Sequence, residues 1–325
     1  MAEEVWMLQT KKADFKQIGA RFRIDPVTAR IIRNRGIEGE AAIDRYLNGT
    51  LDDLYDPMLL KDMERAVSIL CEAVDTGKKI RIVGDYDIDG VCSTYILLQA
   101  FERLGSDVDF EIPDRIKDGY GINESIIEQA HADGVEVILT CDNGISAFHQ
   151  VELAKKYGMT VVITDHHEVP LDGEKEKIPP ADAVIDPKQA DCPYPFPEIC
   201  GAVVAYKLVQ VLYARRGVPQ MEWLDLLEFA AIATVGDVMK LQDENRILVK
   251  YGLKKMAQTK NLGLRRLAEK NNLDLGAITA YHIGFVIGPC LNAGGRLKTA
   301  KEALALLRAQ SEEEAERLAE ELKEL

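Results

Sequence analysis

Short runs of apolar, β-branched residues alternate with helical patterns between residues 79 and 185. The runs at 79–84, 108–113, 135–140, 160–164 and 183–185 have the length and composition of buried strands. The stretches at 91–104, 124–132 and 147–157 repeat apolar residues at helical spacing. Apolar strands that alternate with helices are typical of a parallel sheet covered on both faces. The pattern therefore predicts an α/β fold with a doubly wound, mostly parallel sheet, followed by a helical region.

Helical patterns flank this region on both sides. One helix is expected at 63–74, and others at 201–215, 223–235, 247–259, 264–270 and in the tail from 301 to 325. Segment 169–200 is rich in Pro, Lys and Glu and predicts a surface loop. We therefore expect an N-terminal helical extension at 1–75, an α/β core at 76–215, a helical part of the same domain at 216–300, and the start of a connector helix at 301–325.

Composition narrows the class of protein. The 325 residues are 47% hydrophobic and 29% charged, which predicts a globular chain with a sizeable core. No apolar run is long enough for a membrane span, the acidic N-terminus lacks a secretory pattern, and the six cysteines form no CxxC pair, so we expect a cytoplasmic protein with reduced thiols. The net charge of −14 argues against nucleic acid, unless carboxylates gathered around cations account for it.

Acidic and imidazole side chains follow three of the predicted strands. Asp85, Asp87 and Asp89 follow the first, Asp142 follows the third, and Asp165, His166 and His167 follow the fourth. Open α/β sheets bind ligands at the carboxyl ends of their strands, so one pocket would hold them all. Carboxylates at that density repel one another unless cations or protons lie between them. Oxygen and imidazole ligands favour Mn²⁺ or Mg²⁺ over a metal that prefers sulfur.

Each motif alone also has an ordinary structural interpretation. The DxDxDG run resembles the start of a calcium loop, but Ile96 stands where the twelfth-position acid would be. Asp89-Gly90 and Asp142-Asn143-Gly144 alone would be turns, and Asp237 after Gly236 would normally end a helix. The motifs coincide at strand and helix ends in chain order, which favours one shared site.

Together these motifs resemble the DHH phosphoesterase superfamily, and within it the RecJ family of single-strand-specific exonucleases. The resemblance rests on Gly-Asp-Tyr-Asp-Ile-Asp-Gly at 84–90, Asp-His-His at 165–167, and segments 54–63, 112–121 and 287–297. Segment 287–297 departs from the family pattern, because Cys290 stands where Arg is expected and Gly294 where Ala is expected. RecJ proteins carry further domains after this core, so we expect the chain to represent the catalytic core.

The resemblance implies a catalytic site with two Mn²⁺ or Mg²⁺ ions. Asp142 would bridge the ions, with Asp85 and Asp87 on the first, His166 and Asp237 on the second, and Asp89 shaping the loop or sharing in binding. Asp165 would orient His166 from behind, His167 would face the scissile phosphate, and Arg115, Asn292 and Arg296 would bind substrate phosphate. The implied reaction is 5′→3′ exonucleolytic hydrolysis of single-stranded DNA, in DNA repair and recombination.

Two alternatives stay open at this point. Superfamily enzymes that hydrolyse pyrophosphate, cyclic dinucleotides or short oligonucleotides generally carry a His shortly before the DxD pair, where this chain has Ile82, Val83 and Gly84. A non-catalytic DNA-binding scaffold would be expected to lose metal ligands, whereas this chain keeps them. The resemblance also implies single-stranded DNA as partner, with a single-strand-binding protein or a helicase as protein partners, no membrane, and a monomer.

Overall fold

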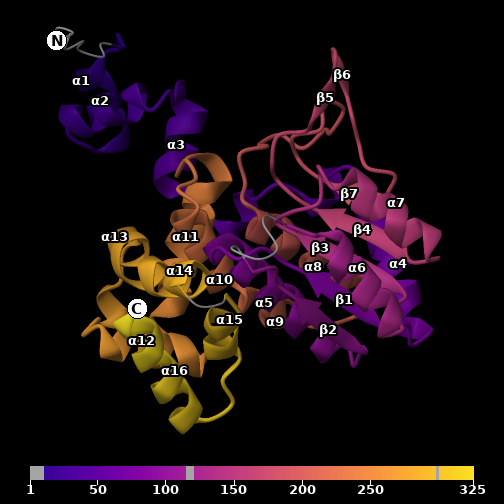
Figure 1. Cartoon of the computed structure of the whole chain (residues 1–325). Coiled ribbons are helices and arrows are strands. Elements are labelled where there is room, and N and C mark those ends of the chain that lie inside the picture. The colour runs from indigo at the N-terminus through magenta and orange to yellow at the C-terminus, as the bar shows by residue number, and fades with distance from the viewer. Residues whose placement is uncertain (1–10, 115–120, 298–299) are drawn as a thin grey trace, which may run out of the picture.

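The structure is a computed structural model that describes residues 11–114, 121–297 and 300–325, without the side chains of 293–297. Its centre is a five-stranded sheet in the order β2-β1-β3-β4-β7, in which every neighbouring pair is parallel (Figure 1). The strands are β1 (Ile80–Val83), β2 (Val108–Glu111), β3 (Val137–Cys141), β4 (Thr160–Thr164) and β7 (Ala183–Ile185). The predicted doubly wound parallel sheet is confirmed.

Alternate residues of β1, β3, β4 and β7 belong to two separate hydrophobic clusters on the two faces of the sheet. Ile82, Leu139 and Val162 belong to the larger cluster, with α4 (Met63–Asp75), α5 (Ile88–Arg103) and α8 (Gly201–Arg215). Val83 and Ile138 face the smaller cluster, with α6 (Glu124–Ala132) and α7 (Phe148–Lys156). The period-two alternation of a strand thus explains how one apolar run serves both faces.

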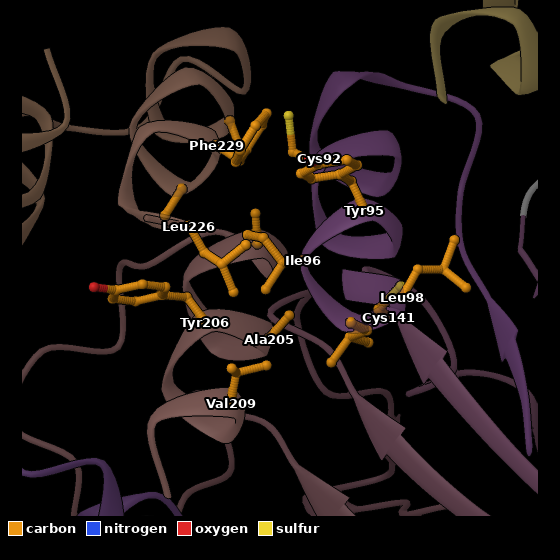
Figure 2. Packing of buried hydrophobic residues seen from close by; sticks show 14 of the residues in the cluster. Cys92, Tyr95, Ile96, Leu98, Cys141, Ala205, Tyr206, Val209, Leu226 and Phe229 are labelled. Atoms are coloured by element: carbon orange, nitrogen blue, oxygen red, sulfur yellow. The ribbon is translucent and has the colours of Figure 1, made fainter. Parts of the chain in front are cut away.

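The larger cluster continues into a helical layer beyond the sheet. There, α5 and α8 pack against α10 (Leu227–Gly236), and Figure 2 shows Ile96 of α5 lying between Tyr206 of α8 and Phe229 of α10. The rings of Tyr95 and Phe229 are 4.3 Å apart between centroids. Because α5 and α10 are both buried over most of their length, this layer holds the helix ends beside the sheet rigidly in place.

The N-terminal segment is helical, as predicted. It contains α1 (Phe15–Phe22), α2 (Pro26–Asn34), α3 (Glu40–Asn48) and the 3₁₀ turns η1 (Leu51–Asp53) and η2 (Pro57–Leu59). Figure 1 shows α1 and α2 standing away from the sheet, whereas α3 lies beside α11 (Asp243–Met256). The guanidinium of Arg45 in α3 lies 3.0 Å from the carboxylate of Asp243, which ties this segment to the body of the protein.

The C-terminal half contains several short helices. They are α9 (Gln220–Leu224), α12 (Leu262–Lys270), the 3₁₀ turn η3 (Leu275–Ala277), α13 (Ala280–His282), the π-helical segment η4 (Ile283–Ile287) and α14 (Gly288–Leu297). The tail forms two helices, α15 (Ala300–Arg308) and α16 (Glu312–Glu324), instead of the single helix predicted. The break occurs because the Ser311 hydroxyl accepts from the amide of Glu314 and caps a new helix.

The prediction of a surface loop at 169–200 is wrong for its second half. The first half carries a small exposed hairpin of β5 (Leu171–Asp172) and β6 (Lys175–Glu176). After β7 the chain turns inward, and Tyr194 is buried with its hydroxyl on the carboxylate of Glu244, which also pairs with the buried Lys207. Composition misled here because the Pro and Lys residues lie among buried apolar ones. No helix in the described part of the chain is long and apolar enough to cross a membrane.

Candidate metal centre

The acidic residues meet where the strand order reverses, at the carboxyl ends of β1 and β3. Asp85 follows β1 by two residues, and Asp142 follows β3 directly. This position is the switch point of a doubly wound sheet, where adjacent connections run to opposite faces and leave a crevice. Asp165 follows the neighbouring strand β4, so its side chain joins the same crevice.

One group of three carboxylates surrounds the start of α5. Oxygen atoms of Asp85, Asp87 and Asp142 lie within 4.8 Å of one another. Asp87 is the N-cap of α5, and its Oδ1 accepts from the amides of Asp89 (2.9 Å) and Gly90 (3.0 Å). The helix cap therefore orients the Asp87 carboxylate beside Asp85 and Asp142, the other members of this group.

A second group lies around the imidazole of His166. Its Nε2 is 3.0 Å from Asp142 Oδ1, 3.4 Å from Asp89 Oδ2 and 3.9 Å from Asp237 Oδ2. Asp237 reaches this point as the C-cap of α10. Asp142 belongs to the first group and also contacts His166, so the residues would suit two neighbouring cations that share Asp142. His167 forms a further possible ligand set with Asp142 and His166.

Asp89 has a structural role in addition to its place in the second group. Its oxygens accept from the amides of Gly201 (2.7 Å) and Ala202 (2.8 Å) at the start of α8. Gly201 also passes so close to Asp142 that an added Cβ would lie 2.7 Å from the Asp142 Cβ. The start of α8 therefore packs directly against Asp142, the proposed bridging residue, and only glycine fits at position 201.

Asp142 is held in an unusual backbone conformation. Its φ is +61°, in the left-handed region that a residue with a side chain adopts only under constraint. The constraint comes from its neighbour Asn143, whose amide group donates to the carbonyls of Val83 (3.0 Å) and Cys141 (2.9 Å). Asn143 is buried and joins the ends of β1 and β3, a role that its turn-forming sequence context does not reveal.

Asp165 contacts a different ring from the one predicted. Its Oδ1 lies 2.7 Å from Nδ1 of His167, whereas it meets His166 only through the backbone amide. Burial opposes a charged imidazole, but the hydrogen bond and charge of Asp165 prevail and raise the pKa of His167 to about 9. In the metal-free protein, His167 is therefore a cation near neutral pH. The assignment of Asp165 to the His166 ring is corrected accordingly, because the carboxylate faces the neighbouring side chain.

The electrostatics of the group favour bound cations. Burial, together with the charge of Asp87, raises the pKa of Asp85 to about 7. Burial and the charges of Asp89 and Asp87 raise the pKa of Asp237 to about 7 and that of Asp142 well above its ordinary value. Burial lowers the pKa of His166, which leaves a neutral imidazole that can donate a lone pair. A divalent cation would remove the carboxylate repulsion.

Buried atoms without hydrogen bonds provide a test of this fit. Among the described residues, Asp85 Oδ2 and His166 Nδ1 are buried and have no hydrogen-bond partner. An orphaned carboxylate oxygen beside other carboxylates is costly in a protein that binds nothing there. The donor set of carboxylate oxygens with one or two imidazoles suits Mn²⁺ or Mg²⁺. The residues present therefore fit a centre of divalent cations.

The structure describes only one of the three predicted phosphate-binding residues with its side chain. Arg115 lies outside the described residues, and Arg296 lies in α14 with a side chain that is likewise outside the description. Asn292 does reach the site, but its Oδ1 accepts from the amide of Ile88 at 2.8 Å and so anchors the loop between β1 and α5. Phosphate binding by these three residues stays a prediction.

Asp186 is a site residue that the sequence patterns did not single out. It follows β7, is fully buried, and has one oxygen without a hydrogen-bond partner among the described residues. Burial and the charge of Asp165 raise its pKa to about 7. The rule that strand ends carry the chemistry could have found it, since the strand at 183–185 was predicted and Asp186 is the next residue.

Comparison with known proteins agrees with this geometry. Residues 79–234 match the DHH family, N-terminal domain, which spans the sheet, α5, α8 and most of α10. This stretch of the chain is similar to the N-terminal domain of the DHH family. It is 37% identical to the single-stranded-DNA-specific exonuclease RecJ of Bacillus subtilis over 98% of this chain, and 36% identical to that of Escherichia coli over 92%. The chain spans 39% of the first relative and 52% of the second.

Solved structures show the same likeness. A crystal structure of exonuclease RecJ bound to manganese is 35% identical and superposes with a TM-score of 0.73, covering 82% of this chain and 65% of that one. RecJ from Thermus thermophilus in complex with Mn²⁺ is 31% identical with a TM-score of 0.79, covering 95% of this chain and 43% of that one. Both related proteins hold the metal type that the donor set of this chain favours.

Proposed function

We propose that this chain is the catalytic part of a metal-dependent exonuclease that hydrolyses phosphodiester bonds of single-stranded DNA from the 5′ end. The observation that carries the proposal is the convergence of two ligand groups, Asp85, Asp87 and Asp142 in the first and Asp89, His166 and Asp237 in the second. Asp142 of the first group lies 3.0 Å from His166 Nε2 of the second, which links the two. The similarity to single-stranded-DNA-specific exonucleases supports the substrate class. Because the chain spans about half or less of these relatives, the whole protein's activity is inferred from its core.

Two divalent cations would be held by the two ligand groups, and they would supply a nucleophile at neutral pH and stabilise charge on the leaving oxygen. The protein's own contribution is positional. Asp87 is set by the α5 cap, Asp142 by Asn143 and Gly201, and Asp237 by the end of the buried helix α10. None of these carboxylates can move without disturbing a packed element, so the ligand geometry is preformed.

His167 would act on the substrate. Its Nδ1 is held by Asp165, and 43% of its side chain is exposed at the crevice. In the metal-free protein Asp165 raises the pKa of His167 to about 9, and while the ring keeps that proton, Nε2 would donate it in a hydrogen bond to a phosphate oxygen. The charge on that oxygen increases as the phosphodiester is attacked, so this hydrogen bond would strengthen in the transition state.

The deciding experiment measures Mn²⁺-dependent release of nucleotides from single-stranded DNA labelled at either end. We expect mononucleotide release from the 5′ end, none from duplex DNA, and none in EDTA. Asp142→Ala serves as the inactive control. Cleavage of a cyclic dinucleotide or of dinucleotides alone, with long single strands untouched, would instead assign the chain to the small-substrate enzymes of the superfamily. Metal-independent DNA binding without cleavage would identify a scaffold.

A single-strand-binding protein or helicase as partner, and a monomeric state, stay predictions. The metal used, Mn²⁺ or Mg²⁺, is tested in the same assay by supplying each ion alone. The donor set tolerates both, because carboxylates bind either ion and a single imidazole favours Mn²⁺ modestly.

A further inference from the structure

The chain that follows β7 lies beside the Asp-His-His segment. β7 is the parallel neighbour of β4, with Thr164 in register with Ile185, and the amide of Asp165 donates to the Ile185 carbonyl at 3.0 Å. Residues directly after Ile185 therefore leave the sheet at the same edge as His166 and His167. The second residue after Asp186 is Lys188.

A rigid turn fixes where Lys188 begins. The amide of Lys188 donates to Asp186 Oδ1 at 2.8 Å, and the side-chain amide of Gln189 donates to the carbonyls of Val184 (2.9 Å) and Asp186 (3.2 Å). Asp186 and Gln189 are both buried. The backbone of Lys188 is thus anchored on the sheet and does not move as a free surface loop.

The ammonium group of Lys188 is held beside the Asp-His-His segment, because its partner Glu168 directly follows His167. Only 19% of the Lys188 side chain is exposed, which is low for a lysine at a loop.

The ion-pair partner of Lys188 is weakly held. Its Nζ lies 2.8 Å from Oε1 of Glu168, the residue directly after His167, and the Glu168 side chain is 85% exposed. An ion pair with a solvent-exposed carboxylate contributes little to stability, so a more highly charged group can replace it at small cost. A phosphate is such a group, and the lysine would only need to rotate its flexible stem.

We propose that Lys188 is a substrate-binding residue of this site, which contacts a non-bridging oxygen of the nucleic-acid phosphate and is paired with Glu168 when no substrate is bound. This inference rests on the proposed function for its substrate, but phosphate binding by Lys188 can be measured separately. It supplies a cation from the β7 side of the crevice, while the metal ligands come from β1, β3, β4 and α10. The ammonium makes the contact as a point charge, so the site tolerates phosphate in more than one orientation.

The test compares Lys188→Ala with Lys188→Arg, Glu168→Gln and the control Lys177→Ala. Lys177 is an exposed lysine after the β5–β6 hairpin, with its ammonium 4.1 Å from the ring centre of Phe148. We measure steady-state digestion of 5′-phosphorylated oligo(dT), and direct calorimetric binding of dTMP with Mn²⁺. Lys188→Ala should raise KM and weaken dTMP binding about tenfold, and should flatten the log–log salt dependence by ~0.7 for one lost phosphate contact.

The other variants separate substrate binding from a structural ion pair. Lys188→Arg should restore part of the affinity, Lys177→Ala should match wild type, and Glu168→Gln should tighten binding because it releases the ammonium. Equal losses in Lys188→Ala and Glu168→Gln, with lowered melting temperatures, would overturn the inference, as would an unchanged KM and dTMP affinity in Lys188→Ala. If wild type binds dTMP through Lys188 but digests no DNA, the proposed function is wrong and the phosphate-binding role of Lys188 is retained. If wild type binds no dTMP, the phosphate-binding role of Lys188 is refuted.

Discussion

Replacing Asp85 by asparagine should stabilise the metal-free protein at alkaline pH. Asp85 is fully buried, and the pKa of about 7, against an ordinary 3.8, means that ionising it in the folded state is costly. At 1.36 kcal/mol per pH unit that difference corresponds to ~4 kcal/mol. We expect roughly half, ~2 kcal/mol, because loop relaxation and entering water recover part of the solvation. Asparagine keeps the acceptor for the Gly121 amide and removes the charge.

The pH dependence follows from the direction of the shift. A carboxyl whose folded pKa is raised binds its proton more tightly in the folded state, so its stabilising effect is full below about pH 4 and is lost as the pH rises through about 7. Metal-free wild type should therefore lose stability between pH 5 and pH 8. Asp85→Asn should lose less, so the two proteins should differ more at pH 8 than at pH 5.

The assay is thermal and urea unfolding in EDTA and in millimolar Mn²⁺ at both pH values. A gain of ~2 kcal/mol corresponds to about 4 °C for a chain of this size. Asp85→Asn should be more stable than wild type in EDTA, and Mn²⁺ should raise its melting temperature much less than that of wild type. Asp186→Asn is the matched control, since Asp186 is also buried with a pKa of about 7 but lies outside the ligand groups, and should keep the response. If Asp85→Asn is no more stable than wild type at pH 8 in EDTA, the buried charge of Asp85 is not the destabilising factor.

The remaining predictions concern the metal, the substrate and the packing. Asp142→Ala should abolish Mn²⁺-dependent cleavage, since its carboxylate belongs to the first ligand group and contacts His166 of the second, and retention of more than a tenth of the rate would contradict its bridging position. Mn²⁺ at a hundredfold excess over its Kd should stabilise wild type by ~2.7 kcal/mol, and melting curves unmoved by both Mn²⁺ and Mg²⁺ would exclude the centre. Single-stranded DNA should bind weakly and with a shallow salt dependence, since the net charge is −14 and aromatic residues are 6% of the chain, and nanomolar binding of a 20-mer at physiological salt would show a more complete groove. Gly201→Ala should impair cleavage more strongly than it lowers the melting temperature, because its methyl would meet the Cβ of Asp142 at 2.7 Å, and unimpaired activity would show that α8 can shift.

Local patterns in the sequence were enough to place most of the metal centre. Asp85, Asp142 and Asp165 each come at the end of a short apolar run, and parallel strands bring their carboxyl ends to one edge. Strand identity, sheet type and the meeting of these side chains therefore follow from composition and order alone. Asp237 has no such local signal, since a helix end with Gly-Asp is ordinary, and it was placed through the resemblance to a known family.

Tertiary packing decided the contacts between segments that are far apart in the chain. Three contacts depend on how whole elements pack together. The amides of Gly201 and Ala202 donate to Asp89, and the Ile88 amide donates to the side chain of Asn292. Asp165 pairs with the ring of His167 and not with that of His166. The inward turn after β7 that buries Asp186 belongs to the same class, because a Pro- and Lys-rich stretch carries no periodicity that reports burial. Period and composition report which face of an element is apolar, whereas the partner of each polar atom depends on distances between elements, which only the folded chain sets.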